Sequence, residues 1–157
     1  MQRASFAEMN CSVAQSLEAV GEWWTLLIIR DALLGITRFD EFSARLGISR
    51  NILTQRLETL VAQNILVKQA YQHNPVRYDY RLTEKGRDLW TVLAALRQWG
   101  DRWTAEDGAP VVSTHSCGQT MTVEPTCSAC GERIGTGELR VHPGPGATTD
   151  NPLAGLR

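Results

Sequence analysis

A short helix, one glycine and a second helix follow one another within residues 42–60, FSARLGISRNILTQRLETL. Gly47 marks the turn, because glycine readily adopts the left-handed conformation that other residues avoid. Ser49 suits the N-cap of the second helix, and Ile48 and Leu53 have the spacing of a hydrophobic staple. The pattern predicts helices over residues 40–46 and 49–63, and this closely spaced pair restricts the folds open to the chain.

The second of these helices has an apolar side and a polar side. Its apolar residues recur at helical steps of four, seven and eight, and they are Leu53, Leu57, Leu60 and Val61. The opposite side carries Asn51, Gln55, Glu58 and Ala62. Taken alone, Asn51 and Gln55 are ordinary solvated residues. On a helix that enters a DNA groove, their amide groups match the donor and acceptor of an adenine edge.

Helical periodicity also predicts helices before and after this pair, within the region up to Trp103. It predicts a short helix over 13–20 and another over 22–34, which is apolar on nearly all sides and is therefore expected to be buried. Gly35 is expected to end that helix in a left-handed conformation. Thr83 is the expected N-cap of a last long helix. Its apolar residues return at steps of three and four, and they are Leu89, Val92, Leu93, Leu96, Trp99 and Trp103.

Between these helices the period changes to two. An apolar series alternates with a charged series, which predicts a half-buried strand over 76–82. The two series are Val76, Tyr78, Tyr80 and Leu82, and Arg77, Asp79 and Arg81. Residues 65–71 can pair with this strand across the turn QHNP, which makes a hairpin. Arg77 lies nearer the tip and is a candidate DNA contact, whereas Arg81 fits the solvated face of the hairpin.

The order helix, glycine turn, helix and hairpin is that of a winged helix-turn-helix, whose second helix enters the DNA major groove. We therefore expect a mainly α fold with a small β-hairpin, an α+β arrangement. Residues 45–87 hold eight basic and three acidic residues, although the whole chain has a net charge of −1. The candidate DNA contacts are Arg50, Asn51, Thr54, Gln55, Arg56, Lys68, His73 and Arg77.

The stretch from Cys11 to Trp103 resembles the HxlR family of bacterial transcription regulators. The shared motifs are the opening cysteine, G-x-W with WTLLI, the turn LLGITRF, G-I-S-x-x-x-L-T-x-R-L and Y-x-L-T-x-x-G. Glu22 departs from the family's usual lysine, and QHNP is one version of a variable wing tip. The resemblance implies a homodimer joined by its first and last helices, which represses or activates a nearby promoter, and we expect a repressor. Its expected interface residues are Leu89, Leu93, Leu96, Trp99 and Trp103.

Cys11 stands just before the first expected helix, where N-terminal amides favour a thiolate. In some relatives of the HxlR type a cysteine at the matching position senses quinones, aldehydes or oxidants. The resemblance thus makes Cys11 a candidate redox or electrophile sensor. The alternative is a small residue packed at the dimer seam, because free cysteines are commonly buried.

The other three cysteines lie in a tail rich in Gly, Thr and Pro. His115, Cys117, Cys127 and Cys130 have the spacing H-x-C, nine residues, then C-x-x-C-G, which suits a structural zinc ion. A segment with so little apolar core needs a bound metal ion or a similar cross-link to stay folded. The alternatives are a redox pair, a hairpin that binds nothing, or a site in which His142, a carboxylate or water replaces His115. We expect a winged-helix domain over 1–106, a zinc-ribbon-like appendage over 107–140 and a flexible tail over 141–157.

The sequence also disfavours several classes of protein. The longest apolar stretch, WWTLLII, stops at Arg30, far short of the roughly 20 residues that span a bilayer. No apolar run follows Arg3, so the N-terminal segment lacks the pattern of a signal peptide. We therefore expect a cytoplasmic protein. No nucleophile and base stand together, so we expect no enzyme. The leading function is a DNA-binding transcriptional regulator with an unidentified effector. The alternatives are a winged-helix module that binds another protein and a thiol or metal sensor that acts without DNA.

Overall fold

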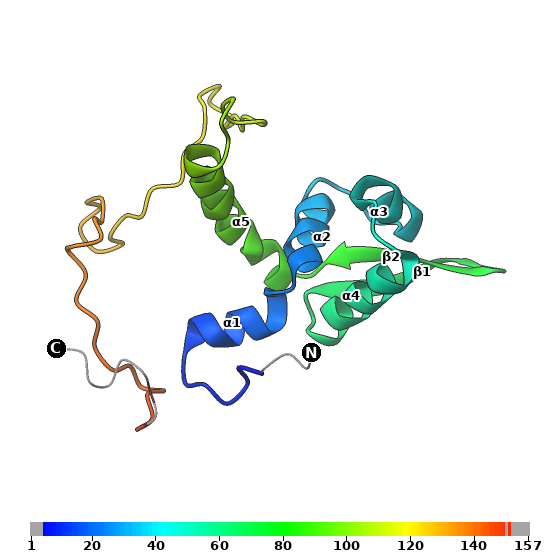
Figure 1. Ribbon diagram of the computed structural model, residues 1–157, viewed down its shortest axis with the longest axis horizontal. Coiled ribbons are helices and arrows are strands. Elements are labelled where there is room, and N and C mark those ends of the chain that lie inside the picture. Colours follow the sequence, from blue (N-terminus) through cyan, green and yellow to red (C-terminus); the bar gives the residue numbers. More distant parts are fainter. Residues whose placement is uncertain (1–4, 150, 152–157) are drawn as a thin grey trace. The chain divides into compact units, whose positions relative to one another are not determined.

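The computed structural model describes residues 5–149 and 151, and within them it contains five helices and one two-stranded antiparallel sheet (Figure 1). The elements are α1 (Ser12–Val20), α2 (Trp23–Leu33), α3 (Phe39–Leu46), α4 (Arg50–Ala62), β1 (Leu66–His73), β2 (Val76–Leu82) and α5 (Glu84–Trp103). Every helix and strand expected from periodicity is confirmed, with ends that differ by at most two residues. No helix among the described residues is long and apolar enough to cross a membrane.

The chain forms two compact units, Met1–Trp90 and Thr91–Arg157. Their boundary falls inside α5, so this helix begins in the first unit and ends in the second. Sequence composition had instead suggested a boundary after residue 106, where the Gly- and Pro-rich tail begins. The first unit contains α1 to α4 and the hairpin, and Figure 1 shows the hairpin extending beyond α3 and α4.

The core of the first unit forms where the apolar faces of α2, α3 and α4 meet the start of β1. Its largest fully buried apolar residues are Ile28, Ile29, Phe42, Leu53, Leu57, Leu60, Ile65 and Leu66. The expectation that α2 is buried all round is wrong in part. Trp23, at its first turn, is 89% exposed, because only the face with Ile28 and Ile29 meets the other helices.

The turn between α3 and α4 has the geometry that its residues predict. Gly47 adopts a left-handed conformation with φ +65°. Ser49 is the N-cap of α4, and its Oγ accepts a hydrogen bond from the Ile52 N–H at 3.3 Å. Ile48 and Leu53 are both buried, as a hydrophobic staple requires. Together these contacts fix where α4 starts.

Residues 37 and 38 lie along the free edge of β2. The Tyr80 N–H donates to the Thr37 carbonyl at 2.7 Å, and Arg38 forms an isolated antiparallel bridge with Asp79. This contact buries Asp79, which the alternating pattern had placed on the solvated side. The Asp79 carboxylate accepts from the Thr37 hydroxyl at 3.3 Å and pairs with Arg81 at 2.8 Å. The hairpin is therefore attached to the helices through its second strand.

Asp31 is fully buried, although an isolated carboxylate would be expected at the surface. Its two carboxylate oxygens pair with different arginines, Arg30 at 2.9 Å and Arg45 at 3.2 Å. Arg30 belongs to α2 and Arg45 to α3, so the carboxylate ties the two helices together. Both arginine side chains remain about half exposed, which lets their outer N–H groups reach water.

We expect Asp31→Asn to lower the free energy of unfolding by about 1 to 3 kcal/mol, because the two charge-assisted hydrogen bonds become neutral ones in a buried place. The matched control is Asp40→Asn, which removes a carboxylate from an exposed ion pair with Arg50 and should cost under about 1 kcal/mol. Urea unfolding of both variants measures the difference. Equal losses would mean that the burial of Asp31 contributes nothing.

Candidate nucleic-acid interface

One face of α4 is exposed and polar because the opposite face is used for the core. Leu53, Leu57 and Leu60 turn inward and are fully buried. The outward residues line a shallow hollow of about 350 Å³, and they are Asn51, Ile52, Thr54, Gln55 and Glu58. The Thr54 hydroxyl donates to the Arg50 carbonyl at 2.9 Å, which orients its side chain along the helix. The hollow thus offers two amides, a hydroxyl, a carboxylate and apolar carbon atoms together.

Arg56 does not share this face, contrary to its assignment as a DNA contact. Its guanidinium pairs with Glu22 at 3.3 Å, its side chain is only 22% exposed, and its Nε is buried. Glu22 is the N-cap of α2, so this ion pair links α4 to α2.

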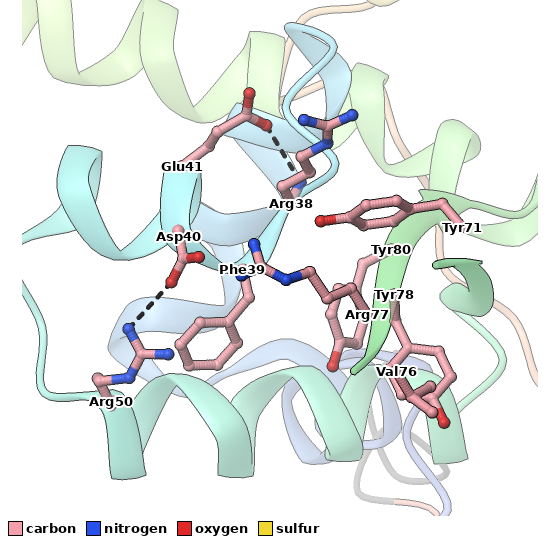
Figure 2. A pocket seen from close by; sticks show the side chains of 10 residues that line it. All are labelled: Arg38, Phe39, Asp40, Glu41, Arg50, Tyr71, Val76, Arg77, Tyr78 and Tyr80. Carbon is pink, nitrogen blue, oxygen red and sulfur yellow. Dashed lines mark hydrogen bonds and ion pairs between the residues drawn. The ribbon is translucent and has the colours of Figure 1, made fainter. Parts of the chain in front are cut away.

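A groove of about 490 Å³ lies between the start of α3, the start of α4 and the hairpin (Figure 2). Arg38, Arg50 and Arg77 enter it from these three elements. The other lining residues are Phe39, Asp40, Glu41, Tyr71, Val76, Tyr78 and Tyr80. Sequence reasoning included Arg50 and Arg77 but missed Arg38 and Tyr71. The signal for Arg38 was its place in the LLGITRF motif, directly before α3.

Aromatic rings hold two of these arginines in place. The Arg38 guanidinium lies 4.7 Å from the centre of the Tyr71 ring, and the Arg50 guanidinium lies 4.6 Å from that of Phe39. Arg50 also pairs with Asp40 at 3.0 Å, across two exposed side chains. Planar guanidinium groups fixed in this way present several N–H donors to a phosphate at little entropic cost. The groove thus combines three guanidinium groups with the carboxylates of Asp40 and Glu41 and several aromatic rings.

The hairpin adds cationic groups to the same unit. The Lys68 ammonium lies 4.2 Å from the centre of the Tyr78 ring, and burial raises the pKa of the neighbouring Tyr80 hydroxyl. A register shift between Ala70 and Gln72 marks a bulge at the position of Tyr71, which lines the groove. His73 is exposed at the end of β1, opposite Val76. Lys68, His73 and Arg77 therefore lie along the hairpin, as the sequence had placed them.

The remaining candidate residues lie outside this interface. Cys11 is the N-cap of α1 and is half-buried, and its role as a sensor stays a prediction. In the tail, backbone N–H groups of Cys130 and Ala129 lower the pKa of the Cys127 thiol. Among the described residues no three His, Cys, Asp or Glu side chains converge on a metal site. His115 and the three tail cysteines are thus not gathered at one point, and zinc stays a prediction.

Known proteins resemble the helices and the hairpin, and some match most of the chain. The model of the HxlR-like helix-turn-helix family matches residues 19–108, which include α2 to α5 and both strands. An uncharacterised HTH-type transcriptional regulator of Mycobacterium bovis, Mb3122, is 41% identical over 137 residues, covering 86% of this chain and 87% of the relative. YvaP of Bacillus subtilis, with the same description, is 30% identical over 98 residues and covers 62% and 91%.

Solved structures of similar proteins agree with the fold. PA1607, a candidate transcription factor, has a TM-score of 0.79 at 36% identity and covers 88% of this chain and 99% of its own. PA1374 of Pseudomonas aeruginosa has a TM-score of 0.66 at 41% identity, with coverage of 89% and 97%. The reduced redox regulator HypR has a TM-score of 0.54 at 30% identity and covers 61% and 98%. These relatives are regulators rather than enzymes, and the chain belongs to the HxlR-like helix-turn-helix family of transcriptional regulators.

Proposed function

We propose that the protein is a homodimeric repressor that binds specific double-stranded DNA. Helix α4 enters the major groove, and the hairpin lies along the sugar–phosphate backbone. The observation that carries this proposal is the exposed row of Asn51, Thr54 and Gln55, which lies on the helix that starts at the arginine-lined groove. DNase footprinting of the purified protein on its own upstream region tests it. A protected segment with two half-sites is the expected result, and uniform cleavage would refute it.

The two kinds of contact have separate tasks. Asn51 and Gln55 lie four residues apart on one side of α4, so both amides can meet base edges in one groove. Arg38, Arg50 and Arg77 surround a space lined by charged and aromatic groups, which suits a phosphate and carries no sequence information. A protein-binding winged helix has no need of three guanidinium groups around one groove. This arrangement favours DNA over a protein partner.

The exposed side of α5 supports the homodimer. Apolar residues on this helix are unusually open to solvent, with Trp99 58% and Trp103 65% exposed. Val92, Leu96, Trp99 and Trp103 recur at steps of four, three and four, whereas Leu89 and Leu93 are half-buried within the chain. A contiguous apolar stripe of this kind usually marks an interaction surface. We place the dimer seam along Val92, Leu96, Trp99 and Trp103, with Leu89 and Leu93 at its margin.

We expect Gln55→Ala and Arg77→Ala to affect DNA binding differently. Gln55→Ala should cost about 1 to 3 kcal/mol on the specific site and little on random DNA, because one bidentate base contact is lost. Arg77→Ala should weaken binding to both DNAs alike, because it removes a phosphate contact. Fluorescence anisotropy with the footprinted duplex and a shuffled duplex measures both effects.

The matched control for Gln55 is Gln63→Ala, which deletes the same side chain at the C-cap of α4, outside the hollow. It should leave both affinities within about 0.5 kcal/mol of the parent protein. Equal losses on specific and shuffled DNA for Gln55→Ala would show that α4 is not the element that reads the bases.

A thiol-dependent response is a second candidate, and it is favoured by two structural relatives. HypR is described as a redox regulator, and YodB has been solved in a reduced and a diamide-treated form, both at about one-third identity or less. Cys11 is half-buried at the N-terminus of α1. We propose it as the reactive group if DNA release by this protein depends on oxidants. A response that persists in Cys11→Ser would assign sensing to another residue.

A further inference from the structure

Two turns in the tail are built to the same plan. In the first, the His115 N–H donates to the Gln119 carbonyl at 2.9 Å, and the Gly118 N–H donates back to the His115 carbonyl at 2.9 Å. In the second, the Cys127 N–H donates to the Glu132 carbonyl at 2.8 Å, and the Gly131 N–H donates to the Cys127 carbonyl at 2.8 Å. Each turn therefore closes through a pair of opposed backbone hydrogen bonds.

Each turn also carries two potential metal ligands before its glycine. His115 and Cys117 precede Gly118 in the first, and Cys127 and Cys130 precede Gly131 in the second. Both glycines adopt a left-handed conformation, with φ of +85° and +76°. The first turn is one residue shorter, as H-x-C-G compares with C-x-x-C-G. The chain thus presents two pairs of soft ligands on two equivalent glycine turns.

Backbone groups already point at the ligand atoms. In the first turn the Cys117 N–H donates to His115 Nδ1 at 3.3 Å, which leaves Nε2 available to a metal. The backbone of Cys117 thus holds the His115 ring within its own turn.

The tail has little else to hold it together. Over residues 107–149 no described residue is buried, and the large apolar side chains Val111, Val112, Leu139 and Val141 are each more than half exposed. A segment this short cannot be stabilised by its own core and needs a metal or a disulfide. Its arrangement of paired His and Cys turns matches the first of these solutions.

The segment between the turns is fixed to α5. The Gln98 side-chain amide donates to the Val123 carbonyl at 2.9 Å, and its oxygen accepts from the Val123 N–H at 2.7 Å. Arg97, next to it, donates to the Ser113 hydroxyl just before the first turn. The appendage is therefore attached to the same helix that carries the exposed apolar stripe.

We propose that the two turns close on one structural zinc ion, held tetrahedrally by His115, Cys117, Cys127 and Cys130. The turns are present as separate pairs, so the ion has to draw them together about the segment that Gln98 holds. Binding deprotonates the three thiols, and His115 binds as the neutral imidazole, so protons are released to solvent. The site is structural because all four positions are filled by protein ligands.

The test uses the full-length protein purified under reducing conditions without chelator. Elemental analysis should give about one zinc per chain, the stoichiometry of a single four-ligand site. Cys127→Ser with Cys130→Ser should abolish bound zinc, whereas the control Cys11→Ser, which changes the one cysteine outside the tail, should retain it. Zinc-free parent protein, or zinc retained by the double variant, would overturn the proposal.

Two further measurements identify the ligands. Cobalt substituted for zinc should show the intense visible bands of a tetrahedral thiolate site, and these bands should shift in His115→Ala but not in His142→Ala. The opposite outcome would overturn the ligand set. Intact mass of the protein as purified distinguishes a redox pair, because a Cys127–Cys130 disulfide in place of bound zinc would refute a zinc site. Footprinting of the double variant should still show DNA protection, which separates this proposal from the proposed function.

Discussion

Binding of the dimer to its DNA site is expected to weaken by about 10³- to 10⁵-fold between 50 and 200 mM salt. Neutralised phosphates release condensed counterions, and log Kd changes with log salt by about 0.9 for each phosphate contacted. Arg38, Arg50 and Arg77 of the groove and Lys68 of the hairpin are four candidate cations per subunit. Eight in a dimer predict a slope of log K against log salt of about −7.

The structure narrows the basic residues counted in the sequence to those that can contact phosphates. Of the eight basic residues between 45 and 87, Arg45, Arg50, Arg56 and Arg81 pair with carboxylates of the same chain at 3.3 Å or less, but the pair of Arg50 with Asp40 is exposed on both sides. Asp31 and Asp79, two of these carboxylates, are buried, so their arginines are committed to the fold. Arg38, which lies outside that stretch, joins the groove instead. The local excess of charge thus remains, but different residues supply it.

Anisotropy titrations at four or more salt concentrations measure the slope. Arg77→Ala should reduce its magnitude by about one per subunit, because each lost phosphate contact removes one such increment. The matched control, Arg87→Ala, deletes an exposed arginine that donates to the Leu82 carbonyl at the base of α5, and it should leave the slope unchanged. A flat response of the parent protein would exclude phosphate contacts and with them the DNA-binding proposal.

Gly86→Ala is expected to destabilise the protein by about 3 kcal/mol. Gly86 is buried in the first turn of α5, where the helix passes over the start of β1. A Cβ at this position would lie 2.3 Å from the Ile65 carbonyl oxygen and 2.8 Å from Leu82 Cδ2. Side chains can rotate away from such a contact, but a backbone carbonyl cannot. The Ile65 carbonyl also accepts from the Thr83 N–H at 3.1 Å, so shifting it disturbs the N-terminal end of the helix.

The same helix provides the control for this substitution. At Gly100 an added Cβ meets nothing closer than the Thr104 hydroxyl at 3.6 Å, an ordinary contact. Gly100→Ala should therefore stabilise the protein by about 0.5 to 1 kcal/mol, because alanine favours the helical conformation. Urea unfolding of both variants gives the comparison. A Gly86→Ala protein as stable as Gly100→Ala would mean that β1 can move away from α5 without loss.

The sequence alone predicted the elements of the fold, because these depend on neighbours along the chain. The spacing of Leu53, Leu57 and Leu60 fixed which face of α4 is buried, and so which face carries Asn51 and Gln55. Local capping fixed its start, since Ser49 bonds the N–H three residues later. The hairpin followed from its alternation, and the family from short motifs. All of these signals act over a few residues and survive without a tertiary structure.

Only the tertiary structure decided how the charged residues are used, because their partners are distant in the sequence. Asp31 is buried against Arg45, and Arg56 pairs with Glu22, 34 positions away. Asp79 was assigned to the solvated side by alternation, but the contact of residues 37 and 38 with β2 buries it. The periodicity of a strand tells on which side a residue lies and does not tell what covers that side. The arginine-lined groove exists for the same reason, since three elements separated in the sequence meet there.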